Sequence, residues 1–292
     1  MPEKNTRVIY QSSPVKNHFL YVWHITVKIS SFVLFGAGTV AISIVVFPVM
    51  LMIFWGRRRF KRAARRFISA MFRFFTWYMS FLHGSRFKTS DDAAFKNLCG
   101  CIVAANHPSL LDVVVLISRI PHADCIVNAS LSGKNIVHVI TRALYISNNL
   151  PYPELIEKCR KSLAEGNTLI IFPEGTRSLP SGQNPFKKGA ARVALATGCP
   201  IVPVFMGGND KVGLRKHDPM LKFHPSDMYR YDLYIKEPLT TDEYRDLPEP
   251  VAARRITKKL QKILSYENNF ENMIGAVEVP VEQITEDGRL DF

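Results

Sequence analysis

The longest charge-free apolar stretch lies near the N-terminus and runs from Ile29 to Trp55. About 20 apolar residues in a helix span the hydrocarbon core of a bilayer, so the stretch predicts a membrane helix. It is too long for the core of a signal peptide, and a basic block stands where a cleavage site would need small residues. Gly36, Gly38 and Pro48 are potential helix breakers. The stretch is therefore compatible with a single membrane span or with a helical hairpin that enters one leaflet.

A second helix is predicted directly after this stretch, over about residues 57–83. It begins with "RRRFKRAARRF" and continues with the aromatic-rich "FISAMFRFFTWYMSFLHG". Its second part could also be a buried core helix. Basic blocks stay on the cytoplasmic side and attract anionic lipid, each charge contributing about 1 kcal/mol near the surface. We expect an interfacial helix on the cytoplasmic face of the cell's inner membrane. The basic residues are Arg57, Arg58, Arg59, Lys61, Arg62, Arg65 and Arg66.

From Cys99 onward, short apolar runs alternate with amphipathic stretches, which predicts strands alternating with helices. Strands are expected at 101–106, 124–130, 168–172, 201–205 and 231–237, and helices at 110–120, 133–144, 152–165, 189–198 and 249–267. This order predicts an α/β fold whose mostly parallel or mixed sheet is covered by helices on both faces. We expect three regions: a leader over 1–90, one domain over 91–269, and an acidic, loosely ordered tail over 270–292.

The positive charge is confined to the leader. The 292 residues carry a formal net charge of +13, and residues 1–90 hold 14 Lys and Arg against the single acid Glu3. Residues 91–292 are neutral, with 24 basic and 24 acidic residues. Because the charge flanks an apolar span, we expect a lipid bilayer and no nucleic acid as the partner. The five cysteines form no CxxC pair and have no histidine at zinc-ligand spacing, so no metal site is expected.

His107 and Asp112 lie in "NHPSLLD", where the first strand of the domain gives way to a helix. At this spacing the carboxylate can fold back to the imidazole, fix its tautomer and raise the basicity of its other nitrogen. His107 is thus a candidate general base. The alternative from the residues alone is a histidine that packs or caps beside the strand end. The serine elbow G-x-S-x-G is absent, and Ser109, Ser130 and Ser132 are interpreted as turn or cap residues.

A second polar motif, "FPEGTRS", follows the apolar run 168–172. Gly175 permits a tight turn, Arg177 presents a fork of donors suited to phosphate, and Glu174 could hold that arginine or bind an acceptor hydroxyl. In parallel sheets, ligands bind beyond the carboxyl ends of strands, so both motifs should face one crevice. That arrangement favours deprotonation of a hydroxyl on a phosphate-bearing substrate. The alternative is a solvated loop ion pair, worth under about 1 kcal/mol.

"NHPSLLD", then "FPEGTRS", then "IVPVF" resembles the lysophospholipid acyltransferase superfamily, which includes the 1-acylglycerol-3-phosphate acyltransferases. The resemblance covers about residues 95–240. It implies a membrane-bound acyltransferase that moves an acyl chain from acyl-CoA or acyl-carrier protein to a lysolipid hydroxyl in phospholipid biosynthesis. The thioester is then a substrate, and no cofactor, metal or covalent enzyme intermediate is required. By this resemblance His107 is the base, Asp112 orients it, and Pro203 shapes a substrate pocket. The acceptor head group would be bound by Glu174, Gly175, Thr176 and Arg177.

One departure from the family concerns its second motif, which usually ends in Asp or Asn followed by an arginine for the acceptor phosphate. Here "ALYISNN" ends at Asn148 and Asn149, without the arginine. Either Arg142 substitutes, or the acceptor is a different lysolipid such as a lyso-ornithine-type lipid. Lys187 and Lys188 are candidates for a CoA or carrier-protein phosphate, or else a solvated basic pair. The alternative function is a non-catalytic membrane adaptor on the same fold.

Overall fold

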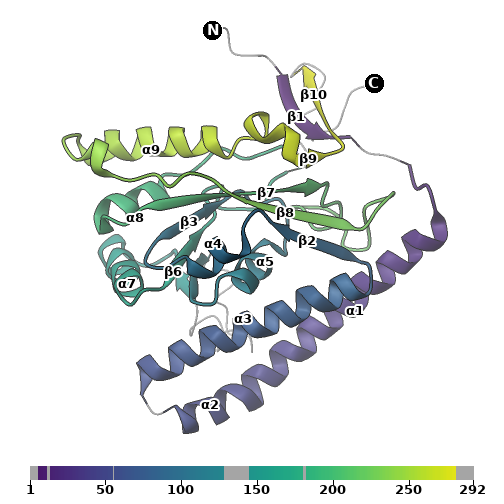
Figure 1. Ribbon diagram of the computed structural model, residues 1–292, viewed down its shortest axis with the longest axis horizontal. Coiled ribbons are helices and arrows are strands. Elements are labelled where there is room, and N and C mark those ends of the chain that lie inside the picture. Colours follow the sequence, from purple (N-terminus) through teal and green to yellow (C-terminus); the bar gives the residue numbers. More distant parts are fainter. Residues whose placement is uncertain (1–5, 12–13, 55, 128–144, 180–181, 281–292) are drawn as a thin grey trace.

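A mixed eight-stranded sheet forms the centre of the protein (Figure 1). The computed structural model describes residues 6–11, 14–54, 56–127, 145–179 and 182–280. The strand order is β2-β8-β7-β3-β6-β4-β5, with β9 beside β7. The strands are β2 (Ser85–Thr89), β3 (Ile102–Ala105), β4 (Ala123–Val127), β5 (Tyr145–Ser147), β6 (Thr168–Ile171), β7 (Ile201–Asn209), β8 (Tyr229–Ile235) and β9 (Met273–Ile274). Strands β7, β3, β6, β4 and β5 run parallel, whereas β8 is antiparallel to β7. The predicted α/β class is confirmed.

Alternate residues of the central strands supply two hydrophobic cores, one on each face of the sheet. In β3, Val103 and Ala105 face a core shared with α4 (Asp92–Asn97) and α5 (Asp112–Arg119), whereas Ile102 and Ala104 face the other core. That second core is covered by α7 (Tyr152–Ala164), α8 (Gly189–Thr197) and α9 (Glu249–Ile263). Two short 3₁₀ turns, η3 (Asp242–Tyr244) and η4 (Glu267–Asn272), flank α9. The helix predicted over 249–267 thus ends at Ile263.

The leader folds into a helical hairpin. Helix α1 (His18–Ala41) continues through the π-helical turn η1 (Ile42–Val46) into α2 (Phe47–Ile53), and near Gly56 the chain reverses into α3 (Arg57–Phe81). The apolar helix therefore begins at His18, eleven residues before the predicted Ile29. Gly36 and Gly38 do not break it, and Pro48 follows the π turn, whose altered hydrogen-bond register tolerates the missing N–H.

The two arms of the hairpin lie side by side along their length (Figure 1). The indole of Trp23 donates to the carbonyl of Leu82 at 3.1 Å, and the hydroxyl of Tyr78 donates to Ser30 at 3.0 Å. Closer to the tip, the rings of Phe47 and Phe60 pack edge to face. The hairpin is consequently closed by polar contacts at its open end and by aromatic packing near its tip.

Helix α3 is fixed to the sheet domain partly by Arg65, one of the basic residues predicted to lie against lipid. Arg65 is buried and forms a bidentate ion pair with Asp124 of β4, at 2.7 and 2.8 Å. Ser69 donates to the carbonyl of Ile117 in α5 at 2.8 Å. Arg65 is therefore unavailable to anionic headgroups, and the prediction is wrong for this one member of the basic block. Arg58, Arg59, Arg62 and Arg66 are exposed.

A two-stranded antiparallel ribbon joins the ends of the described chain. Strand β1 (Thr6–Tyr10) pairs with β10 (Ala276–Pro280), and the Tyr10 hydroxyl donates to the carbonyl of Gly208 in β7 at 3.0 Å. The loosely ordered tail predicted from residue 270 is therefore wrong as far as Pro280, and residues 281–292 lie outside the described residues. The structure also differs from the boundary expected at residue 90, because β2 pairs with β8 inside the sheet.

Candidate active site

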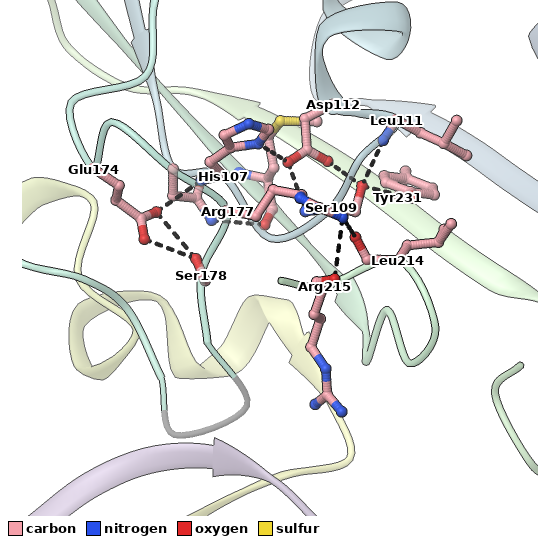
Figure 2. Close-up of polar contacts among 12 residues, drawn as sticks. His107, Ser109, Leu111, Asp112, Glu174, Arg177, Ser178, Leu214, Arg215 and Tyr231 are labelled. Carbon is pink, nitrogen blue, oxygen red and sulfur yellow. Dashed lines mark hydrogen bonds and ion pairs between the residues drawn. The ribbon is translucent and has the colours of Figure 1, made fainter. Parts of the chain in front are cut away.

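His107 and Asp112 meet at the carboxyl end of β3, as the spacing predicted (Figure 2). The Nδ1 atom of His107 lies 2.7 Å from Oδ2 of Asp112, the first residue of α5. Asp112 is fully buried, whereas the imidazole is 15% exposed. Phe172 stacks on the imidazole with ring centroids 4.1 Å apart. Since Nδ1 is committed to the carboxylate, Nε2 is the nitrogen available for proton transfer.

Ser109 is more than the turn or cap residue that the sequence suggested. Its backbone N–H donates to Asp112 Oδ2 at 2.7 Å and its hydroxyl donates to Oδ1 at 2.5 Å. The same hydroxyl lies 2.9 Å from that of Tyr231, and Leu111 N donates to it at 3.2 Å. Both Asp112 oxygens are thus held in place by hydrogen bonds from Ser109. Ser109 and Tyr231 fix the carboxylate that orients the imidazole.

Glu174 has a different place from the one expected. It is 2% exposed, and its carboxylate accepts from the backbone N–H of His107 at 2.8 Å, from Asn184 N at 2.9 Å and from the Ser178 hydroxyl at 2.9 Å. Burial raises the pKa of this carboxyl, although these hydrogen bonds oppose the shift. Among the described ion pairs, none joins Glu174 to Arg177. Glu174 therefore ties the "FPEGTRS" loop to the His107 turn, and both of its oxygens accept hydrogen bonds from neighbouring groups.

The remaining residues of this loop are partly open. Gly175 has a φ of +71°, a conformation that favours glycine, and a Cβ there would lie 2.8 Å from Lys187 Nζ. Thr176 and Arg177 are half-buried. Nη1 of Arg177 donates to the carbonyls of Leu214 and Arg215 at 3.0 and 3.1 Å. Glycine thus lets the Lys187 side chain lie against the same loop that carries Arg177.

The remaining predicted positions are Pro203, Arg142, Asn148 and Asn149. Pro203 is buried within β7, opposite Ala104 of β3. Arg142 and the helix predicted over 133–144 fall outside the described residues. Asn148 and Asn149 directly follow β5, and Asn149 accepts a hydrogen bond from Ser147 at 2.6 Å. In the described ranges, no three His, Cys, Asp or Glu side chains gather closely enough to hold a metal ion.

An apolar cavity of about 150 Å³ lies between the hairpin and the His107 turn. Phe32 and Phe35 of α1 and Phe75 of α3 form one side, and Leu110 and Leu111 form the other. These two leucines lie between His107 and Asp112 in the chain. The site therefore adjoins a space whose walls suit an alkyl chain.

Comparison with known proteins matches the central part of the chain to a known family. Residues 86–207 match the model of the family described as Acyltransferase. This segment, which is less than half of the chain, is therefore similar to the acyltransferase family. The matched segment runs from β2 into β7 and includes both the His107 turn and the "FPEGTRS" loop, whereas the α1–α3 hairpin and Tyr231 lie outside it.

Several curated proteins resemble this chain. The 1-acyl-sn-glycerol-3-phosphate acyltransferase BAT2, chloroplastic, of Brassica napus is 28% identical over 165 residues, covering 53% of this chain and 45% of the relative. The human 1-acyl-sn-glycerol-3-phosphate acyltransferase beta is 26% identical over 139 residues, covering 44% and 50%. The chain thus spans about half the length of these relatives.

A solved structure shares the fold. The 1-acyl-sn-glycerophosphate (LPA) acyltransferase PlsC from Thermotoga maritima superposes with a TM-score of 0.60 at 18% identity, covering 83% of this chain and 96% of that chain. The match extends well beyond the acyltransferase segment, so the architecture around the site is shared as well.

The sequence alone did not reveal the groups that support this site from a distance. Tyr231 lies 122 positions from Ser109, and Leu214 and Arg215 supply only backbone carbonyls, which carry no residue-specific signal. Asn184 lies ten residues after Glu174 in a segment without periodicity. Ser109 alone had a local signal, because a serine three residues before a helix-starting Asp commonly bonds with it.

Proposed function

We propose that the protein is a membrane-surface acyltransferase that moves an acyl chain from acyl-CoA or acyl-carrier protein to the free hydroxyl of a lysolipid. The observation that carries this proposal is the 2.7 Å contact between His107 and the fully buried carboxylate of Asp112. The relatives' names favour 1-acyl-sn-glycerol-3-phosphate as the acceptor.

The proposed chemistry is direct transfer. Nε2 of His107 takes the proton of the acceptor hydroxyl while its oxygen attacks the thioester carbonyl carbon. The C–O bond forms, the C–S bond breaks, and the leaving thiolate recovers a proton from the imidazolium. Asp112 stabilises that imidazolium and holds its Nδ1 proton. His107 is therefore the residue on which turnover depends most.

Two cations beside one exposed glycine suit the acceptor's phosphate. Arg177 uses Nη1 for the backbone, and in the described part of the chain none of its other donors is hydrogen-bonded. A guanidinium with free donors binds phosphate in a bidentate manner, and Lys187 adds a point charge. Because the second-motif arginine is absent at Asn149, a lyso-ornithine-type acceptor is the second candidate.

The hairpin is proposed to hold the site at the bilayer surface. The continuous helix from His18 to Ile53 is long and apolar enough to cross a membrane. Of its most apolar stretch of 18 residues, only 11% is buried. However, α1 and α2 run along α3, and α3 is fastened to the sheet domain through Arg65 and Ser69 and by packing on α5 and β2. To span the bilayer, the helix would have to separate from the sheet domain. These contacts therefore favour a hairpin that lies in one leaflet. Exposed side chains such as Phe19, Val33 and Met52 would then enter the acyl-chain region.

Acyl transfer by the purified full-length protein in nanodiscs tests the proposal. Acyl-CoA and acyl-carrier protein should each be offered with lysophosphatidic acid, lysophosphatidylcholine or a lyso-ornithine lipid. We expect transfer to at least one acceptor and a loss of about 10²–10⁴-fold in His107→Ala, with unchanged folding and membrane attachment. Turnover of His107→Ala near the wild-type rate would exclude this mechanism. Lipid binding by the wild type without transfer in any combination would support the adaptor instead.

A further inference from the structure

Lys28 is the only formally charged residue of α1. Its side chain points away from the apolar helix and into the sheet domain. It is 4% exposed, and its ammonium donates to the carbonyls of Gly213 and Lys222 at 2.8 and 2.7 Å. The hydroxyl of Tyr229 lies 3.5 Å away. A buried ammonium is tolerated only when such acceptors surround it. Lys28 is thus a specific link between a membrane helix and the segment 211–222.

That same segment holds the acceptor-side arginine and the catalytic turn. The carbonyl of Leu214 accepts from Nη1 of Arg177 at 3.0 Å and from the backbone N–H of Leu110 at 3.0 Å. The carbonyl of Arg215 accepts from Arg177 at 3.1 Å (Figure 2). Lys28 binds Gly213, which is one residue from Leu214. Two adjacent peptide groups therefore connect the helix in the membrane to Arg177.

The segment has little freedom to absorb a change at Lys28. Gly213 has a φ of +82°, and a Cβ on it would lie 2.0 Å from the Lys222 carbonyl and 2.6 Å from Lys28 Nζ. Its N–H donates to Asp218 at 2.8 Å. Since the turn closes tightly around the ammonium, loss of that ammonium leaves the buried Gly213 carbonyl and the part-buried Lys222 carbonyl without this donor. The segment must then shift, and Leu214 is the nearest residue to move.

We infer that Lys28 is a positioning residue for Arg177. By holding segment 211–222, it makes the α1–α3 hairpin part of the acceptor-binding site. This inference rests on the proposed acyl transfer and on the binding of the acceptor by Arg177. It gives α1 a role beyond anchoring, because the helix sets where two carbonyl oxygens hold the guanidinium.

Steady-state kinetics of full-length variants in nanodiscs test this role. Lys28→Met should raise the acceptor KM about tenfold and change the donor KM little. Losing a hydrogen bond to a charged group typically weakens binding by about this factor. Lys28→Gln keeps one donor on a neutral side chain and should raise the acceptor KM about threefold. Tyr78→Phe is the matched control, because it removes a contact of the same hairpin to Ser30 without touching segment 211–222.

A double mutant separates positioning from general damage. If Lys28 acts through Arg177, adding Lys28→Met to Arg177→Lys should change the acceptor KM less than about threefold, whereas independent effects would multiply. Unchanged kinetics in both Lys28 variants, multiplied effects in the double mutant, or an equal effect of Tyr78→Phe would overturn the inference.

Amide hydrogen exchange gives a readout that needs no turnover. Peptides covering Leu110 and residues 211–222 should exchange faster in Lys28→Met than in the wild type. If Lys28→Met does not fold, Lys28→Gln takes its place. In Tyr78→Phe the exchange of these peptides should be unchanged. Unaltered exchange in the Lys28 variants would overturn the inference even if the wild type transfers acyl groups. Conversely, absent acyl transfer by the wild type would refute the proposed function, while faster exchange would still support the link from Lys28 to this segment.

Discussion

The hydroxyl of Tyr231, on β8, lies 2.9 Å from that of Ser109 in the His107 turn. The Ser109 hydroxyl in turn donates to Asp112. Tyr231, which lies outside the matched segment 86–207, thus supports the carboxylate that contacts His107. The sheet makes this possible because β8 pairs with β7, which pairs with β3.

Ser109→Ala should therefore lower kcat by roughly 10–100-fold, because Asp112 loses a charge-assisted hydrogen bond and can rotate away from the imidazole. Tyr231→Phe should lower it only about threefold, since Ser109 keeps its direct bond. Ser118→Ala is the control: this buried serine of α5 bonds to the carbonyl of Val115 and does not contact the site. Stopped assays at saturating substrates measure the three rates. A Ser109→Ala enzyme as active as Ser118→Ala would contradict the supporting role.

Arg177→Lys should raise the acceptor KM by about tenfold or more and leave the donor KM nearly unchanged. Lysine keeps the charge but cannot hold two carbonyls and a phosphate at once, which the planar guanidinium can. Arg192→Lys on α8 serves as control, because Arg192 forms an exposed ion pair with Glu249. Initial rates with each substrate varied separately decide the matter. A raised donor KM with a normal acceptor KM would mean that the two substrate sites have been exchanged.

The residues that were placed correctly from sequence are those whose partners lie nearby in the chain. His107 and Asp112 are five residues apart, and the alternating runs from Cys99 onward follow the sheet's own period. The start of α1 was missed because Lys28 looked like the limit of an apolar helix. In the fold, carbonyls of Gly213 and Lys222 surround that charge, so it does not end the helix.

The errors at the chain ends have another cause. Strand β10 is stabilised by β1, more than 250 positions away, and neither strand has a core-facing pattern strong enough to predict the pair. Likewise, Arg65 belongs to a basic block by composition, but a carboxylate 59 residues later, Asp124, removes it from the surface. Partners at such separations are set by the tertiary fold and leave no mark on the local pattern.

Glu174→Gln should destabilise the protein by about 1–3 kcal/mol at neutral pH, because an amide NH₂ would face the donors of His107 and Asn184. The pH dependence should also change. Burial raises the folded-state pKa of Glu174, so between its unfolded value of about 4.3 and that raised value the folded state binds more protons. In that window this group makes the wild type lose stability as pH rises.

Denaturant unfolding from about pH 4 to 7 checks both parts of the Glu174 prediction. The contribution from Glu174 should vanish in Glu174→Gln, whereas Glu157→Gln, at an exposed pair with Arg160, should match the wild type. If Glu174→Gln and the wild type show parallel stability curves over this range, the carboxyl does not titrate with a raised pKa.

The last prediction concerns how the hairpin meets the membrane. Removing residues 1–56 would also delete β1 and Lys28, so truncation cannot separate anchoring from folding. Charge reversal is cleaner, and the residues to reverse are Arg58, Arg59, Arg62 and Arg66, all exposed on α3. At about 1 kcal/mol per basic residue near an anionic surface, their conversion to Glu should weaken binding to anionic vesicles by roughly 10²–10³-fold. Binding to neutral vesicles should persist, since the apolar face of α1 and α2 is unchanged.

The matched control for the charge reversal lies on α9, which is on the opposite side of the sheet (Figure 1). Four exposed residues there, changed to Glu, alter the net charge equally: Arg254, Arg255, Lys258 and Lys262. Because the Debye length is about 10 Å at 0.1 M salt, charges on that far face should hardly affect binding. Flotation with anionic and neutral vesicles compares the two variants. If the α9 variant loses binding as strongly as the α3 variant, net charge governs attachment, and the hairpin does not set which face of the protein meets the lipid.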